Sequence, residues 1–118
     1  MEWLLRTQVL FGEETVKRLQ NATVAVLGLG GVGGSAAEAL CRMGVGTLIL
    51  VDKDTVDVTN LNRQLLATTA SVGVDKVEAA RQRLLSINPK VNLALKKEFY
   101  LPQQSDFLYQ CSPDLVLD

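Results

Sequence analysis

The sequence predicts an α/β fold: a doubly wound, mostly parallel sheet with helices on both faces. Short apolar runs alternate with segments of helical periodicity along the chain. The first two runs have no polar face, which is typical of parallel strands that are covered on both sides. A glycine-rich turn joins the first run to the following helical segment. Strands that alternate with helices in this way imply right-handed crossover connections between parallel neighbours.

The expected elements follow in order along the chain. Residues 13–20 have the apolar spacing of a short amphipathic helix, with Val16 and Leu19 on one side. Strands are expected at 23–27, 47–51, 91–97 and 114–118. The third strand alternates apolar and polar residues and is expected near an edge, whereas the last is expected to be buried. Helices are expected at 32–43, 74–88 and 102–110.

The two longest helices are expected to pack on the sheet through apolar stripes. In 32–43 the stripe consists of Val32, Ala36, Leu40 and Met43, and the small residues between them allow a close approach to the sheet. Gly44 and Gly46 are expected to end this helix, and Pro89 the next. The stripe of the helix at 74–88 consists of Val74, Val77, Ala80, Leu84 and Ile87.

Composition excludes several kinds of chemistry. The 118 residues include no His, so they can form neither a Ser-His-Asp triad nor a His-based zinc site. Cys41 and Cys111 lie far apart and make neither a CxxC pair nor a disulfide framework. We expect Cys41 to be a small buried hydrophobic residue and neither cysteine to be catalytic. A net charge of −1 indicates no broad nucleic-acid-binding surface on this chain.

Neither a signal peptide nor an apolar stretch of membrane-spanning length is visible, so we expect a cytoplasmic protein without a membrane partner. Residues 1–22 are expected to form a helical segment ahead of an α/β domain over 23–118. The apolar run that ends at Asp118 resembles a buried strand, which is an unlikely place for a natural protein to end.

The glycine-rich turn is the first sign of function. Gly28, Gly30 and Gly33 lie between a strand and a helix, which is the setting of the Rossmann-like nucleotide fingerprint. The first glycine permits the tight turn, the second lets the backbone approach a phosphate, and the third lets helix and strand touch. Asp52 ends the second strand, where a carboxylate can accept hydrogen bonds from a ribose. A turn that serves packing alone is the alternative.

The segment after Asp52 bears on which nucleotide is bound. It is rich in Asp, Asn and Arg, including Asp54 and Arg63, and Lys76 follows at the start of the next helix. Arg63 and Lys76 lie where they could reach phosphates, and a triphosphate needs such cations. The alternatives are that both are solvated surface charges and that Asp54 and Asp57 only form turns.

These residues together resemble the adenylating enzymes related to ubiquitin-activating enzymes, the superfamily of the ThiF, MoeB and HesA proteins. The resemblance covers about residues 6 to 118. It rests on four features in order: Gly28-x-Gly30-Gly31-x-Gly33, Asp52-x-Asp54, Asn60-x-x-Arg63-Gln64 and Lys76. Further matches, including Val56-Asp57-x-Thr59-Asn60 and Ile87-Asn88-Pro89, point to the branch that acts on a modified adenosine of tRNA.

The resemblance implies a role for each matched residue. The backbone at Gly28, Gly30, Gly31 and Gly33 would bind ATP phosphates, with Asp52 on the ribose and Asp54 beside it. Asn60, Arg63 and Lys76 would contact the triphosphate, Arg63 and Lys76 as catalytic residues. Arg6 would reach the ATP of the second protomer in a homodimer, although a frayed surface arginine is equally consistent with the residues. The Asp that helps to bind Mg²⁺ in the family would lie beyond Asp118, so no metal ligand is expected within the chain. The resemblance therefore implies that residues 23–118 are the N-terminal half of a longer ATP-binding domain, which alone would bind nucleotide poorly.

The implied reaction is ATP-dependent activation of a carboxylate as an acyl-adenylate. In the tRNA branch, the carboxylate belongs to the threonylcarbamoyl group of the modified adenosine, which then cyclises by dehydration. The second possibility is the C-terminus of a ubiquitin-like sulfur-carrier protein. An NAD-binding oxidoreductase domain is a third interpretation of the glycine turn, from a different class of enzyme.

Overall fold

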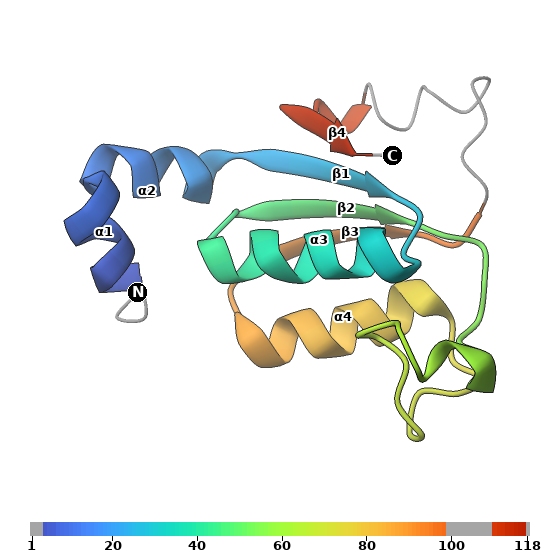
Figure 1. The fold of residues 1–118 in the computed structure, drawn as a ribbon. Helices are drawn as coiled ribbons and strands as arrows, with labels where there is room; N and C mark the ends of the chain where they lie inside the picture. The colour runs from blue at the N-terminus through green and yellow to red at the C-terminus, as the bar shows by residue number, and fades with distance from the viewer. Residues whose placement is uncertain (1–3, 99–109, 118) are drawn as a thin grey trace.

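The computed structural model describes residues 4–98 and 110–117 and, for Arg6 and Thr7, the backbone alone. Its centre is an all-parallel sheet of four strands in the order β3-β2-β1-β4 (Figure 1). The bounds are Thr23–Leu27 for β1, Thr47–Val51 for β2, Asn92–Lys96 for β3 and Leu115–Leu117 for β4. The predicted α/β class, the parallel sheet and the edge position of β3 are therefore confirmed.

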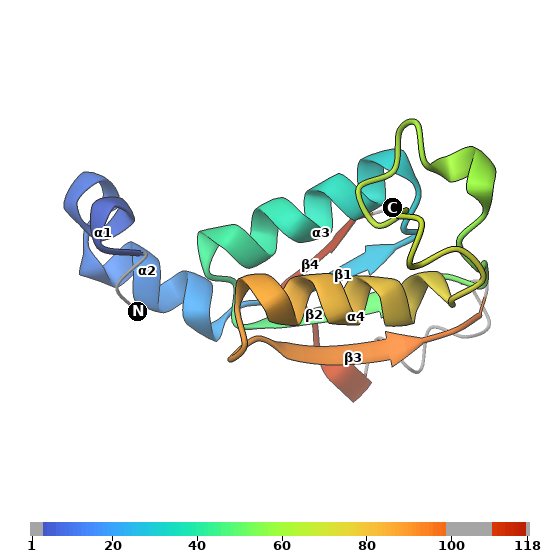
Figure 2. The same cartoon turned by 90° about the horizontal axis from the view of Figure 1, so that it is seen from below.

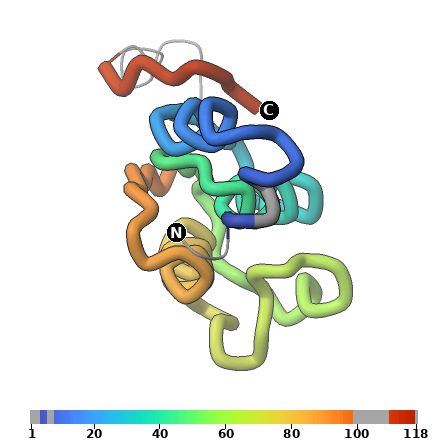
Figure 3. Tube along the Cα trace, turned by 90° about the vertical axis from the view of Figure 1, so that its left-hand side faces the viewer, coloured from blue at the N-terminus to red at the C-terminus, as the bar shows by residue number. Residues whose placement is uncertain are grey.

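The helices lie in two places relative to this sheet. α1 (Leu5–Phe11) and α2 (Glu13–Asn21) lie at the amino-terminal end of the strands, nearest the viewer in Figure 3. α3 (Gly31–Met43) and α4 (Lys76–Ile87) pack side by side on one face of the sheet (Figure 2). Helices on the opposite face remain a prediction, since the helix expected at 102–110 falls almost wholly outside the described residues. No helix in the described ranges is long and apolar enough to cross a membrane.

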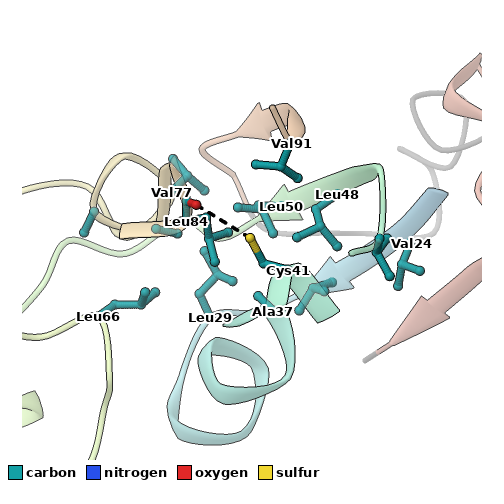
Figure 4. Close-up of a cluster of buried hydrophobic side chains, with 14 of the residues drawn as sticks. Val24, Leu29, Ala37, Cys41, Leu48, Leu50, Leu66, Val77, Leu84 and Val91 are labelled. Atoms are coloured by element: carbon teal, nitrogen blue, oxygen red, sulfur yellow. Dashed lines mark hydrogen bonds between the residues drawn. The ribbon is translucent and has the colours of Figure 1, made fainter. Parts of the chain in front are cut away.

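The sheet separates two apolar clusters because side chains along a strand alternate between its faces. The larger cluster joins the helix-facing residues Val24, Val26, Leu48 and Leu50 to α3, α4 and the loop after β2 (Figure 4). The smaller one contains Ala25, Ile49 and Val51 on the other face. Both central strands are thus covered on both faces, as their continuous apolar runs predicted.

The predicted apolar stripe of α3 is wrong for Val32 and Met43, whereas Leu40 packs against the larger cluster as predicted. Val32 is 87% exposed and Met43 49% exposed, while Ala37 and Cys41 are buried with Gly34 and Glu38. The reason is the closeness of the helix to the strand and turn before it: a Cβ on Gly33 would lie 1.8 Å from the Gly28 carbonyl oxygen. Because only small side chains fit at this distance, the first turn of α3 faces the sheet through its glycines and Val32 turns outward.

The expectation of a buried last strand is also wrong for the residues described. Leu115 is 51% exposed and Val116 42% exposed. Within the described part of the chain, β4 is an edge strand that pairs only with β1. The stripe predicted for α4 is confirmed, since Val77, Ala80 and Leu84 are buried and Val74 and Ile87 pack against the same cluster.

Candidate nucleotide-binding site

The residues expected to bind nucleotide come together at the carboxyl ends of the strands. The turn after β1, the loop after β2 and the first residues of α3 and α4 all lie at this edge (Figure 1). In open α/β sheets this edge forms the ligand crevice. Its backbone is tied together, because the Gly28 N–H donates to the Val51 carbonyl at 2.7 Å and the Asp52 N–H donates to the Lys96 carbonyl at 3.1 Å.

Three glycines of the turn differ in their surroundings and in their backbone conformation. Gly28 has φ of +95°, a backbone conformation that side chains with a Cβ rarely adopt. Gly33 lies against the Gly28 carbonyl, where no Cβ fits. Gly30 differs from both, since a Cβ added there would meet nothing within 4 Å. The turn is therefore tightly packed where Gly33 meets Gly28, and it leaves open space beside Gly30.

The open side coincides with the N-terminus of α3. Gly30 is the N-cap residue and no side chain caps this helix. The Gly34 N–H donates to the Gly30 carbonyl at 2.8 Å, so the N–H groups of the preceding residues, including Gly31, precede the first intrahelical bond. These donors and the helix dipole favour an anion in the open space.

Asp52 holds this edge together. Its carboxylate is 9% exposed and accepts the Leu29 N–H at 2.6 Å and the Asp54 N–H at 2.7 Å, one on each oxygen. The side chain therefore joins the glycine turn to the loop after β2. Each carboxylate oxygen can accept a further hydrogen bond, so this clamp is compatible with ribose binding. Sequence reasoning predicted the ribose role and missed the clamp.

The segment after Asp52 is a folded lobe and not a loose polar loop. Val56, Leu66 and Ala67 are buried in the main core. The Val56 N–H donates to the Val74 carbonyl at 2.8 Å, and the Lys76 N–H donates to the Asp54 carbonyl at 2.9 Å. These bonds fix the lobe against the start of α4. Its polar side chains are therefore preorganised.

A short 3-10 helix, η2 (Val58–Asn60), presents the Asn and Arg of the lobe. Asn60 is 7% exposed, and its amide oxygen accepts the Asp57 N–H at 2.8 Å. Arg63 is exposed and donates to the Thr59 carbonyl at 2.9 Å. The Arg63 carbonyl lies 3.9 Å from the position of a Cβ on Gly31, so this turn adjoins the start of α3.

Lys76 is the most informative residue of the site. It is 7% exposed, and no carboxylate of the described chain lies within 4.0 Å of its ammonium. The neighbouring Asp75 is instead paired with Lys97 at 2.7 Å. Lys76 also begins α4, where the helix dipole disfavours a cation. The described residues contain no fully buried side-chain nitrogen without a partner, so the ammonium of Lys76 keeps contact with solvent although the rest of the residue is buried. It is therefore open to an anionic ligand.

The remaining expected residues are placed less tightly. Asp54 is exposed at the mouth of the lobe, and its backbone N–H bonds to Asp52. The side chain of Arg6 lies outside the described part. Among the described residues no three Asp, Glu or Cys side chains cluster as metal ligands would. A hollow of about 270 Å³ between residues 65–71 and α4 contains none of the expected site residues.

Sequence reasoning placed Gln64 in a matched motif without giving it a role, and it missed the contact between Glu38 and Arg83. Gln64 is 9% exposed, and its side chain has no hydrogen-bond partner in the described ranges. Its amide is therefore a further polar group of the lobe that could bind a ligand. Glu38 of α3 is buried and bonds to both Arg42 and Arg83, with Arg83 at 3.0 Å. The bond from Arg83 holds the pKa of Glu38 below its ordinary value. The spacing of Glu38 and Arg42 could have indicated their pairing, but nothing in the sequence indicated Arg83.

Cys41 conforms to its prediction. It is fully buried, and its thiol donates to the Leu84 carbonyl at 3.6 Å (Figure 4). Burial raises the pKa of this thiol, which keeps it protonated. The site thus consists of backbone N–H donors, Asp52, Asn60, Arg63 and Lys76, an arrangement suited to a polyanionic nucleotide.

Comparison with known proteins places this arrangement in a family. The ThiF family model matches residues 5–118, and the chain belongs to the ThiF family. The chain is 46% identical over 113 residues to the tRNA threonylcarbamoyladenosine dehydratase of Bacillus subtilis, covering 96% of this chain. It is 39% identical over 107 residues, 91% of this chain, to the probable adenylyltransferase/sulfurtransferase MoeZ of Mycobacterium tuberculosis.

The fold has a close counterpart among solved structures. The Escherichia coli tRNA N6-threonylcarbamoyladenosine dehydratase, TcdA, in complex with ATP superposes with a TM-score of 0.93 and 36% identity, over 98% of this chain and 47% of that chain. The chain spans 44% of the length of the Bacillus relative and 27% of the Mycobacterium relative.

Proposed function

We propose that the protein is an ATP-dependent adenylating enzyme that activates the carboxylate of the threonylcarbamoyl group on a modified adenosine of tRNA. The similarity to the Bacillus dehydratase and to the ATP-bound Escherichia coli structure supports this proposal. The observation that carries it is Lys76, which is buried without a counter-charge at the edge where the glycine turn leaves open space. A triphosphate supplies the anion that this arrangement lacks.

The residues fit ATP in a consistent way. The backbone N–H groups at Gly30 and Gly31 are proposed to bind phosphate oxygens, because the space above Gly30 is open to a ligand. Asp52 would accept hydrogen bonds from the ribose, using the lone pairs that its two backbone donors leave. Asn60, Arg63 and Lys76 would donate to the triphosphate, and Asp54 would lie at the rim of the same site.

The chemistry needs charge stabilisation more than a proton-transferring side chain. A substrate carboxylate oxygen bonds to the α-phosphorus while the bond from that phosphorus to the pyrophosphate oxygen breaks. Arg63 and Lys76 stabilise the charge that develops on the phosphate oxygens, which is commonly the largest contribution in such reactions. The resulting acyl-adenylate then closes intramolecularly with loss of AMP. The absence of His from the chain is compatible with this first step.

Mg²⁺ is proposed to bind together with the phosphates. This ion usually keeps several waters and takes only one or two protein carboxylates. The described residues bring no three acidic side chains together. Further protein ligands are proposed to come from residues that follow Asp118 in the full-length protein.

A homodimer is proposed on the basis of α1. Val9 is 85% exposed, Leu10 76% and Phe11 65%, so this helix displays an apolar surface that a second copy could cover. Arg6 lies in the same helix. If α1 packs on a second copy, Arg6 would be carried toward the partner's ATP.

A second candidate function is favoured by the similarity to the Mycobacterium protein MoeZ. The substrate would then be the C-terminus of a ubiquitin-like sulfur-carrier protein, with the same adenylation chemistry. An NAD-binding oxidoreductase domain is less well supported, because a dinucleotide pyrophosphate carries less charge for Arg63 and Lys76 to neutralise.

Pyrophosphate release by the full-length protein distinguishes these functions. We expect release with ATP and tRNA that carries the threonylcarbamoyl group, and none with the same tRNA lacking that group. Release with a carrier protein alone would favour the second function. Binding of NADH without binding of ATP would reject adenylation altogether.

A further inference from the structure

Hydrogen bonds within the turn at residues 57–63 determine which atoms Asn60 and Arg63 can offer to a ligand. The Asp57 N–H is a donor, so the atom of Asn60 that faces it at 2.8 Å must be the amide oxygen. The NH₂ group of Asn60 must then point the other way. This turn therefore fixes Asn60 as a hydrogen-bond donor toward its surroundings, as binding of an anion requires.

The side chain of Asp57 holds this turn in shape. Its Oδ1 atom accepts the Thr59 N–H and the Thr59 hydroxyl, each at 2.9 Å. Together with the bond from the Asp57 N–H to Asn60, this makes a capping box around η2. These bonds to Thr59 also lower the pKa of Asp57, so the carboxylate is ionised near neutral pH.

Arg63 depends on the same turn. Its guanidinium donates to the Thr59 carbonyl at 2.9 Å and to the Asn62 amide oxygen at 3.1 Å. Thr59 therefore links the two residues, because Asp57 binds its N–H and hydroxyl while its carbonyl binds Arg63. Asp57 itself is exposed and belongs to neither apolar cluster, so its carboxylate serves the local turn and not the core.

We propose that Asp57 is a positioning residue for ATP binding, which acts by fixing η2 so that Asn60 and Arg63 present their donors together. This inference rests on the proposed function of the site. A direct role for Asp57 in contacting phosphate is disfavoured, because its carboxylate would repel that group and its Oδ1 already has two donors. A role as a metal ligand would require the negative charge, whereas a positioning role requires only an acceptor oxygen.

This difference defines the experiment. Asp57→Ala removes the acceptor, whereas Asp57→Asn keeps an acceptor oxygen and removes the charge, and Asn is as good a cap as Asp. A matched control is Asp114→Ala, since Asp114 is an exposed carboxylate that accepts the Thr23 N–H at 2.8 Å at the opposite end of β1. The measurement is kcat and KM for ATP in ATP–pyrophosphate exchange by the full-length protein, with tRNA that carries the threonylcarbamoyl group supplied as the carboxylate substrate.

We expect Asp57→Ala to lower kcat/KM about 5- to 30-fold, the factor that corresponds to loss of a typical cap, with most of the change in KM for ATP. Asp57→Asn should stay within about threefold of wild type, since its acceptor oxygen is retained. Asp114→Ala should match wild type. Wild-type kinetics for Asp57→Ala would overturn the proposal, and so would equal damage by Asp57→Asn, which would show that the charge itself is used.

Two further measurements keep the result interpretable. Thr59→Val removes one donor to Asp57 at nearly constant shape, and it should raise KM in the same direction if Asp57→Ala fails to fold. In wild-type protein, NMR should show a dispersed Asn60 side-chain NH₂ resonance that moves in Asp57→Ala. If the wild type shows no exchange activity, the proposed function fails. An unmoved Asn60 resonance would instead overturn the positioning role.

Discussion

Two charged regions of this molecule are built in opposite ways. Between α3 and α4, Glu38 is bonded to Arg42 at 2.9 Å and to Arg83 at 3.0 Å, so the buried charge is fully paired. At the carboxyl edge of the sheet, Lys76 is equally buried and has no carboxylate within 4.0 Å in the described part. Both regions involve a long charged side chain on α4, one residue at its start and one in its last half.

The difference separates charges that stabilise the fold from charges kept for a ligand. A buried charge that its own chain neutralises can be explained by packing alone. A largely buried charged residue that its own chain leaves unpaired is not explained in this way, so its presence points to a partner absent from the free protein. On this criterion the α3–α4 contact serves the fold, and the carboxyl edge is the part of the molecule that we propose to bind the ligand.

The strongest test of the comparison is Lys76→Met, which keeps the length of the side chain and removes its charge. We expect kcat/KM for ATP–pyrophosphate exchange in the full-length protein to fall by two to three orders of magnitude, about 3–4 kcal/mol of barrier. The free energy of unfolding should change by less than about 1 kcal/mol, because no ion pair of the described residues is lost with this charge. Chemical denaturation measures the second quantity.

Lys97→Met is the matched control, since Lys97 is a neighbouring lysine whose charge Asp75 already neutralises. Its activity should remain within about twofold of wild type, as expected for a partly exposed ion pair of small energetic weight. Equal loss in both variants would mean that the general positive charge of this edge matters and that the burial of Lys76 does not.

The reverse pattern is expected for Arg83→Met. Loss of its two bonds to the buried Glu38 should lower the free energy of unfolding by about 1–2 kcal/mol, with exchange activity unchanged below the melting transition. Arg81→Met offers the comparison on the same helix, because Arg81 pairs with the more exposed Glu78 and should matter much less. A large loss of activity in Arg83→Met with unchanged stability would contradict the assignment of this contact to structure.

The same ion pair predicts a pH dependence of stability. The pKa of Glu38 is lowered from its ordinary value of 4.5 in the folded protein, mainly by the hydrogen bond from Arg83. The unfolded state therefore binds the proton more readily, so this stabilisation is complete above about pH 4.5 and is lost as the pH falls through the lower folded value. Urea titrations between pH 6 and pH 3 should show a smaller loss of stability in Glu38→Gln. An identical pH profile in the variant would exclude Glu38 as a source of the dependence.

The sequence was a good guide wherever one local pattern determined the structure. Continuous apolar runs located β1 and β2 to the residue, because both are covered on both faces. The glycine turn was predictable because Gly28 and Gly33 each require glycine, the first for its backbone conformation and the second for lack of space for a Cβ. The buried face of α3 could not be predicted in the same way. Most of its residues are small or apolar on every side, and the closeness of the sheet determines which of them turn inward.

The residues of the candidate site could be proposed from the sequence, but their contacts with one another could not. The residues of the site could be named from their types and spacing, yet the clamp of Asp52 on Leu29 and the partnership of Glu38 with Arg83 join positions 23 and 45 residues apart. Nor could the sequence show that Lys76 is buried while Lys97 is paired with Asp75. Burial and pairing depend on the tertiary structure, and the proposed role of Lys76 rests on both.

The smallest expected effect is on the reactivity of the two cysteines. They differ in burial, whereas the two charged regions differ in pairing. Cys41 is fully buried, and that burial raises the pKa of its thiol, whereas Cys111 is partly exposed. In the native protein we expect Cys111 to react with a thiol reagent and Cys41 to react only at the rate of unfolding, without loss of exchange activity during the first reaction. Mass spectrometry of the labelled peptides over time measures both rates. Fast labelling of Cys41 would show that α3 separates from α4 in the native state, and the paired contact of Glu38 and Arg83 would then be weaker than its geometry indicates.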